Sequence, residues 1–392
     1  MRSDFLRILP IYLVLLLWMI LWTASVGGPV MPLYVQSLGV GITGWSILAT
    51  ALALGMFFFE SSWGTLTDRV DRRFLIFFAM LAMSLLFPLY TFHFLVPYFV
   101  VMQFFAGAIG VILGPTTRVY VLDKAPPKYV GLFTSVWWAF YSVGGIVGPL
   151  VGTHLAKSCS FNCAFYASTA LALVLGGLVM FTFPKLKRTT IPHKTQSLKS
   201  ILYSRPSGCL FMSAAFAFMT ISLMRSFLPL YASQLIKMST VQVGVLISAT
   251  FAVQLVTVPL VGWVADKFGR RKVAILGFTT SAIVFLSFLL VKTPSQLLLA
   301  SGIVSVGISA SSLLLLGVIP EVTPDKFYGT AVGVYGAFED LGGIFGPLVF
   351  GLVWTALTPV AIFVVGSLAQ LVGAFLIFAT KPQKNSIKHS IR

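Results

Sequence analysis

The sequence predicts an all-α integral membrane protein with twelve transmembrane helices arranged as two pseudo-symmetric six-helix bundles. Its composition, the spacing of its apolar segments and an internal repeat lead to this prediction. Of the 392 residues, 58% are hydrophobic and only 9% are charged. Soluble domains carry about 25% charged residues, so lipid must be the solvent for much of this apolar surface.

Twelve apolar segments of roughly the length that crosses a bilayer, about 20 residues, follow one another along the chain. They run over 9–33, 45–64, 74–93, 95–122, 131–155, 163–184, 208–231, 241–262, 273–291, 296–319, 330–353 and 359–380. The first is too long for the core of a signal peptide, so we expect it to remain as a membrane helix.

One longer polar stretch separates the sixth and seventh segments and divides the chain in two. We therefore expect a bundle over 1–184, a basic cytoplasmic linker over 185–207, a second bundle over 208–380 and a cytoplasmic tail over 381–392.

The basic residues are distributed as in a membrane protein that orients itself through its cytoplasmic loops. The net charge is +17, and 22 of the 27 Lys and Arg residues fall on one side of the predicted membrane, whereas 3 fall in loops on the other. This bias predicts a multi-pass protein of the cell membrane with both termini in the cytoplasm. No soluble domain is available to bind nucleic acid, so the partner that the charge indicates is membrane lipid.

Several motifs recur at an offset of 198 residues. Gly64-x-x-x-Asp68 returns as Gly262-x-x-x-Asp266, and Gly144-Gly145-Ile146-x-Gly148-Pro149 returns as Gly342-Gly343-Ile344-x-Gly346-Pro347. A repeat of six helices keeps both halves in the same orientation, related by an axis along the membrane normal. In such proteins the substrate site is expected where the two halves meet.

The loop over 64–73 resembles the conserved loop of the major facilitator superfamily, G-x-L-a-D-r-x-G-r-r. The second copy, over 262–271, fits that pattern better, because Asp71 replaces a glycine in the first copy and predicts a local difference there. The resemblance covers nearly the whole chain. It implies the two-bundle fold of that family, transport of a small molecule by alternating access, and a monomer.

The same resemblance implies a latch on the cytoplasmic side, in which paired arginines hold an acid at another helix end. The alternative is that the arginines only orient the chain and anchor it to lipid. The residues implied as the latch are Gly64, Asp68, Arg72, Arg73 and Asp123 in the first half, and Gly262, Asp266, Arg270, Arg271 and Glu321 in the second.

The fifth segment carries Gly144-x-x-x-Gly148-Pro149-x-x-Gly152, which resembles the antiporter signature of the family. Glycines four residues apart let helices pack closely, and proline bends a helix by removing a backbone donor. The resemblance implies antiport, whereas packing and bending alone are the alternative. The eleventh segment has a near copy at Gly342, Gly346 and Pro347.

The fourth segment departs from the pattern of many drug exporters of the family, which have an intramembrane arginine four residues before a glycine. Here Gln103 stands four residues before Gly107, so one proton-coupling element is missing. Gln103 remains a candidate for that position.

Two adjacent acids, Glu339 and Asp340, lie about ten residues into the eleventh segment, ~14 Å along the helix and close to the membrane midplane. The matching residues of the first half, Tyr141 and Ser142, are uncharged. Charges inside a membrane are costly and mark function by default. Neighbouring carboxylates also raise each other's pKa, which suits reversible protonation. The alternative is a buried acid held by structural hydrogen bonds.

Three further charges lie in or beside apolar segments. Glu60 and Arg118 lie near the inner ends of the second and fourth segments, where they either pair or reach to the headgroups. Arg225 lies in the outer part of the seventh segment, where the first half has Gly28. It is suited to bind an anionic group or to balance Glu339 or Asp340, with reach to the outer surface as the alternative.

Aromatic residues gather on the fifth segment at Trp137, Trp138 and Tyr141. Aromatic walls suit apolar or cationic ligands, although lipid contact and packing explain them as well. Cys159 and Cys163 share a loop predicted to lie outside the cell, where disulfides form. Either a bridge or two free thiols fits this loop.

No nucleotide-binding G-x-x-x-x-G-K segment and no metal-ligand spacing occur in the sequence, so we expect no ATP drive, no metal and no cofactor. No catalytic constellation is evident, and the protein is not expected to be an enzyme. We predict a secondary active transporter that exports a small hydrophobic or cationic compound in exchange for protons, as multidrug-efflux proteins do. The alternatives are a metabolite or organic-anion importer or uniporter, a lipid flippase, and a membrane receptor without transport.

Overall fold

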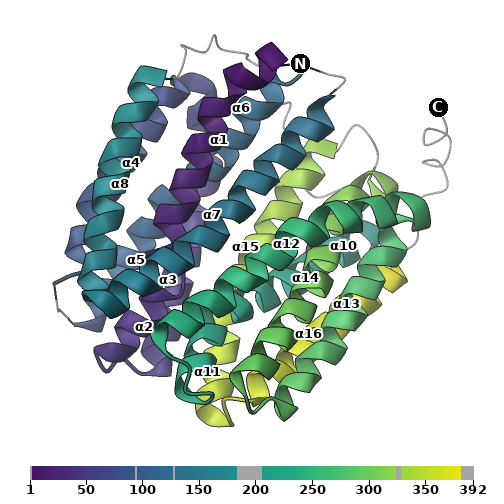
Figure 1. The fold of residues 1–392 in the computed structure, drawn as a ribbon. Helices are drawn as coiled ribbons and strands as arrows, with labels where there is room; N and C mark the ends of the chain where they lie inside the picture. Colours follow the sequence, from purple (N-terminus) through teal and green to yellow (C-terminus); the bar gives the residue numbers. More distant parts are fainter. Residues whose placement is uncertain (1, 93–94, 127–128, 183–204, 324–327, 381–392) are drawn as a thin grey trace. The chain divides into compact units, whose positions relative to one another are not determined.

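The computed structural model describes residues 2–92, 95–126, 129–182, 205–323 and 328–380, and every regular element in these ranges is helical (Figure 1). The first half contains α1 (Arg2–Thr23), α2 (Val30–Ser37), α3 (Ile42–Arg69), α4 (Arg72–Leu89), α5 (Val96–Gly110), α6 (Leu113–Lys124), α7 (Val130–Ser158) and α8 (Phe161–Thr182). The second contains α10 (Arg205–Ser222), a π-helical turn η2 (Leu223–Phe227), α11 (Leu228–Gln234), α12 (Thr240–Phe268), α13 (Arg270–Ser287), the short η3 (Phe288–Leu290), α14 (Pro294–Val322), α15 (Tyr328–Ala356) and α16 (Ala361–Ala379).

Ten of the helices in the described ranges are long and apolar enough to cross a membrane, by length and composition. Two further apolar helices, Ile8–Thr23 and Val96–Gly110, are shorter. An all-helical membrane protein is therefore confirmed, whereas the count of twelve spans stays a prediction. The predicted linker lies outside the described residues except for its last three positions, and the predicted tail lies outside them entirely.

Two predicted segments are interrupted in the structure. The first is broken between α1 and α2, where Gly27, Gly28 and Pro29 follow one another. The fourth is broken between α5 and α6, because Pro115 has no N–H to donate to the Val111 carbonyl. Both stretches are apolar throughout, so hydropathy alone shows no boundary there.

The chain forms two compact units, and the division between them does not follow the linear halves. The first unit comprises 1–191 together with Leu228–Leu255, and the second comprises 192–227 together with Val256–Arg392. Thus α11 and the first part of α12 pack within the first unit, although the sequence repeat places them in the second half.

Two helix pairs recur in both units. In the first unit α1 packs on α7 and α4 packs on α8. In the second unit the counterparts 198 residues later do the same: α10 packs on α15, and α13 packs on α16. The repeat of packing is partial, because α5 packs mainly on α3 in the first unit, whereas its counterpart α14 packs mainly on α13 in the second.

Glycines set the closest helix contacts. In the first unit, a Cβ at Gly107 of α5 would overlap the Leu52 carbonyl of α3, and a Cβ at Gly55 would overlap the Phe104 carbonyl. Gly277 and Gly307 bring α13 and α14 together in the second unit in the same manner. Only glycine permits backbones to approach this closely.

Replacing Gly107 by alanine should therefore lower the stability of the folded protein by about 1–3 kcal/mol, the usual cost of overfilling a packed contact. Gly177 of α8 is the matched control, because a Cβ there meets no atom within 4 Å. Thermal unfolding of the two alanine variants in detergent measures the difference. Equal midpoints would show that the α3–α5 contact is not limited by Gly107.

Candidate functional site

The two acids predicted in the membrane lie half-buried on α15 in the second unit. Tyr335, one turn earlier, is buried, and its hydroxyl donates a hydrogen bond of 3.2 Å to the Ser312 carbonyl of α14. Tyr335 also interacts electrostatically with Glu339, which places this acid beside the α14–α15 contact.

Arg225 lies on η2, the π-helical turn that joins α10 to α11, and its side chain is exposed. This turn packs against α10 and α15. Within the described residues, Arg225 forms no hydrogen bond or ion pair. The predicted pairing of Arg225 with Glu339 or Asp340 is thus absent from the described part of the chain.

The second basic loop brings together the four charged residues implied as its latch. Gly269 has a φ of +94°, which favours glycine, and turns the chain from α12 into α13. Arg270 lies 3.8 Å from Asp266, donates a hydrogen bond of 3.1 Å to the Gly317 carbonyl of α14, and interacts electrostatically with Glu321. The Asp266–Arg270 pair is largely exposed and contributes little by itself.

Arg271 binds the end of another helix. Its Nε donates to the Ile377 carbonyl at 3.1 Å, and its Nη2 donates to the Phe378 carbonyl at 2.6 Å. These carbonyls lie in the last turn of α16, where helix carbonyls lack intrahelical donors and carry partial negative charge. The loop therefore fastens α13 to the ends of both α14 and α16 within one unit.

The first basic loop is built differently, at the position where the sequence departs from the family pattern. Asp71 has a φ of −59° and caps α4 by accepting a hydrogen bond of 3.0 Å from the Arg73 backbone. Its carboxylate also holds the Arg73 guanidinium, with 2.8 Å between Nη2 and Oδ2. The side chains of Asp68 and Asp123 lie outside what the structure describes, so the latch of this half stays a prediction, as do the roles of Gly64 in α3 and of Arg72, which is half-buried.

Glu60 and Arg118 do not form an ion pair among the described residues. Glu60 is half-buried on α3, whereas Arg118 is exposed on α6 and has no described partner. An exposed arginine near a helix end is the arrangement that the headgroup alternative describes.

Gln103 is fully buried on α5 in an aromatic cluster. Its Oε1 accepts a hydrogen bond of 3.3 Å from Tyr90, and its Nε2 has no partner within the described residues. Tyr90 stacks on Phe165 with 5.4 Å between ring centroids, and its carbonyl accepts from the Tyr34 hydroxyl at 2.7 Å. Because the side chain is enclosed, Gln103 holds α4 and α5 together through Tyr90.

The aromatic residues of α7 have separate roles. Trp137 is buried, and its Nε1 donates to Thr117 of α6 at 3.1 Å. Tyr141 stacks on Trp137 at 5.6 Å, and Trp138 meets both rings edge-on. Trp138 and Tyr141 are half-buried, so these two, rather than Trp137, are available to a ligand.

One face of α7 packs on α1 through its glycine row. A Cβ at Gly148 would overlap Thr23 and the Ile20 carbonyl, and a Cβ at Gly152 would overlap the Ala24 carbonyl. The corresponding glycines of α15, Gly342 and Gly346, pack on α10 in the same way. Gly144 of α7 also lies on the α1 side, against Met19 and Leu16. In both units the glycine motif is thus a packing surface.

A neighbouring face of α7 contacts the first part of α12, a contact within the first unit. Ser248 donates a hydrogen bond of 2.7 Å to the Ile146 carbonyl. A Cβ at Gly244 would overlap Thr153 and approach the Pro149 carbonyl. Gly244 and Ser248 were not predicted, although small residues four apart are a readable signal of helix contact. We call this contact the α7–α12 seam.

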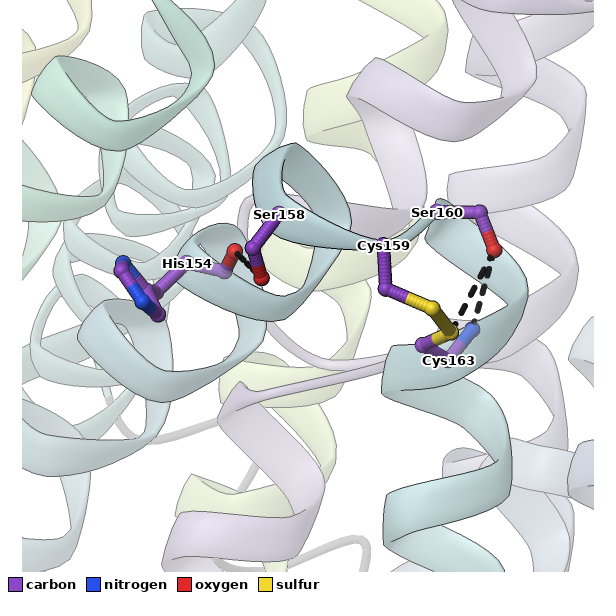
Figure 2. Close-up of a disulfide and its surroundings, with 5 residues drawn as sticks. All are labelled: His154, Ser158, Cys159, Ser160 and Cys163. Carbon is purple, nitrogen blue, oxygen red and sulfur yellow. Dashed lines mark hydrogen bonds between the residues drawn. A yellow bond between two sulfur atoms is a disulfide. The ribbon is translucent and has the colours of Figure 1, made fainter.

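The turn between α7 and α8 is closed by a disulfide between Cys159 and Cys163, as Figure 2 shows. Cys159 caps the end of α7, and the Ser160 hydroxyl accepts a hydrogen bond of 3.4 Å from the Cys163 backbone. The preceding residue, Ser158, donates to the His154 carbonyl at 2.8 Å. Cys159 is exposed and Cys163 is half-buried. In the described residues, no group of three or more His, Cys, Asp or Glu side chains is placed to hold a metal.

Comparisons with known proteins agree on one family. The family model of the Major Facilitator Superfamily matches residues 13–239 and 210–391. The chain is 23% identical over 343 residues to a protein of Rahnella sp. (strain Y9602) named multidrug resistance protein MdtG, covering 82% of this chain and 80% of that protein. The protein of the same name from Enterobacter lignolyticus is 25% identical over 348 residues, with 82% and 79% covered.

Among solved structures, a bacterial homologue of the human lysosomal transporter Spinster, inward-facing and occupied, has a TM-score of 0.80 at 14% identity, covering 95% of this chain and 96% of that one. A D-xylose–proton symporter has a TM-score of 0.78 at 18% identity, covering 97% and 99%. A mutant form of the nucleoside transporter NupG has a TM-score of 0.80 at 14% identity, covering 95% and 99%. At these identities the likeness shows the fold.

Replacing Arg271 by glutamine should lower the unfolding midpoint, because the variant loses two charge-assisted hydrogen bonds to the end of α16, together about 1–3 kcal/mol. Lys272→Gln is the control, since this neighbouring side chain is exposed and removes the same charge. If both variants unfold at the same temperature, charge alone rather than the α16 contact explains the effect.

Proposed function

The chain belongs to the Major Facilitator Superfamily of membrane transporters, and on that premise we propose that it exports a small hydrophobic or cationic compound in exchange for protons by alternating access. The proposal includes a monomer in the cell membrane with both termini in the cytoplasm. Its support for efflux is the name of the relatives and the antiporter-like motif of α7. Its support for alternating access is the α7–α12 seam.

The α7–α12 seam joins a helix of the first repeat to a helix of the second inside one compact unit. Transport by alternating access requires such a contact to break and re-form once in each cycle. One hydrogen bond from Ser248, the packing of Phe251 against Gly145 and the close approach of Gly244 to Thr153 hold the seam. Side-chain hydrogen bonds between membrane helices average about 0.6 kcal/mol, so a seam of this kind opens without unfolding the helices.

Glu339 and Asp340 are the proposed carriers of the coupled proton. They are half-buried in a predicted span, and the repeat does not require them, because Tyr141 and Ser142 occupy the same places in the first half. Tyr335 interacts electrostatically with Glu339, and its hydroxyl donates to the Ser312 carbonyl. Because the hydroxyl has a single proton, we infer that the Glu339 carboxylate competes with the Ser312 carbonyl for it and that protonation of Glu339 strengthens the link between α15 and α14.

A second candidate function is import or facilitated passage of an organic anion. The exposed guanidinium of Arg225 favours it, because no described residue neutralises this charge. The direction in which the compound crosses the membrane distinguishes export of a hydrophobic or cationic compound from import of an organic anion.

The coupling proposal predicts that ethidium, a lipophilic cation, accumulates in proteoliposomes with an acidic lumen and that a protonophore abolishes this accumulation. Glu339→Gln or Asp340→Asn should abolish uphill uptake, because a residue that cannot release its proton cannot exchange it. Downhill ethidium exchange without a gradient is the control for folding. Wild-type uptake that ignores the pH gradient, or full coupling in both variants, would refute proton exchange.

The α7–α12 seam predicts that Gly244→Val blocks transport, since the larger side chain overlaps Thr153 and the Pro149 carbonyl and holds the seam open. Both uphill uptake and downhill exchange should then fall. Gly177→Val is the control, because a Cβ at Gly177 meets no atom within 4 Å. A Gly244→Val protein that transports normally would show that the seam does not close during the cycle.

A further inference from the structure

Arg225 is the single exposed residue in a long helical stretch that is otherwise covered. Between Met212 and Leu235, every other residue is buried or half-buried. A helix with one open face has a different pattern: α16 exposes Leu368, Leu371, Phe375 and Phe378, one residue per turn. Because Arg225 does not belong to such a stripe, we take its exposure to be local rather than part of a lipid-facing surface.

The helix backbone is irregular at Arg225. Pro229 has no N–H, so the Arg225 carbonyl loses its usual helix donor, and the preceding residues form the wider π turn Leu223–Phe227. Phe227 is buried against Phe350 and Trp354 of α15, with centroid distances of 6.2 and 6.0 Å. Arg225, two residues earlier, lies on the opposite side of this turn.

The first repeat is interrupted at the corresponding position, between the end of α1 at Thr23 and the start of α2 at Val30. Interruptions at matching places in the two halves of a transporter point to its binding site. The first half has Gly28 where the second has Arg225, so the fold itself does not need the charge.

The cost of the charge is also uncompensated by the described residues. Arg225 is nine residues from the end of the span Pro206–Gln234, ~13 Å along the helix. A guanidinium at this depth is costly unless it meets water or an anion. Its planar fork of N–H donors matches a carboxylate or phosphate in two-point contact.

We propose that Arg225 is an anion-binding residue of the transport site and that the transported compounds include ones that carry a carboxylate, phosphate or sulfonate group beside an apolar body. This inference rests on the proposed transport function and adds amphipathic anions and zwitterions to its substrate class. Glu339 and Asp340 then handle the proton, while Arg225 holds the substrate anion. An amphipathic anion or a zwitterion fits this division, whereas a purely cationic compound does not use Arg225.

The test uses the full-length protein in detergent and three probes with one aromatic body: 1-naphthoate, 1-naphthalenemethanol and 1-naphthylmethylammonium. Binding to the folded state raises the unfolding temperature. Naphthoate should stabilise the wild type at lower concentration than the alcohol does. Arg225→Gln should weaken naphthoate binding about tenfold or more and leave the alcohol unchanged, as expected for loss of a charge-assisted contact. Arg225→Lys should retain part of the preference.

Lys292→Gln is the matched control, because it removes one exposed positive charge in the loop after η3. It should bind naphthoate like the wild type. Equal binding of naphthoate and the alcohol by the wild type, or unchanged naphthoate binding by Arg225→Gln, would overturn the proposal.

Two further arms separate the neighbouring explanations. If phosphatidylglycerol nanodiscs, but not phosphatidylcholine nanodiscs, abolish the Arg225-dependent naphthoate binding, the anion is a lipid headgroup and the substrate assignment fails. If naphthoate binds through Arg225 but does not cross proteoliposome membranes under any gradient, transport fails while the anion site stands.

Discussion

The structure depends on one constraint: in hydrocarbon, backbone polar groups must be satisfied within each helix, and helices must then pack without a hydrophobic drive. This chain meets the constraint with glycines that let its helices approach closely. Gly107 against the Leu52 carbonyl joins α5 to α3, and Gly277 beside Gly307 joins α13 to α14. The charged and polar candidates are placed by these contacts, since a helix fixed at such short range cannot rotate its side chains to another face.

The glycine motif of α7 takes part in two helix contacts of different extent, one with α1 and one with α12. Toward α1, three glycines spaced four residues apart meet backbone atoms, a contact between helices of one repeat. Toward α12, one glycine meets the Phe251 ring, and a single hydrogen bond of 2.7 Å reaches the Ile146 carbonyl. The first contact joins backbones over three turns, whereas the second adds one close approach, that of Gly244 to Thr153 and the Pro149 carbonyl. Because α7 packs more extensively on α1 than on α12, it is suited to remain with α1 while α12 moves away.

The sequence predicted those parts of the molecule that depend on periodicity. The 198-residue offset anticipated the recurring helix pairs, and Asp71 in place of glycine anticipated that the two basic loops would differ, as φ values of −59° and +94° show. The breaks before Val30 and Leu113 were not predicted from hydropathy, because both fall in apolar sequence, although Gly27-Gly28-Pro29 and Pro115 mark these places. The burial of Gln103 could not be predicted from the sequence, because its partner Tyr90 lies at the end of another helix, α4.

Function in a repeated fold is best sought where the repeat fails. Packing explains residues that both halves share, such as Gly148 and Gly346, because the same helices meet in both units. It does not explain Glu339 opposite Tyr141, or Arg225 opposite Gly28, since the first half folds without either charge. A charge inside a membrane is costly unless a partner or a ligand compensates for it. For these two charges, an acid beside Tyr335 and an exposed arginine, binding of a proton and of an anion are therefore the roles that we propose.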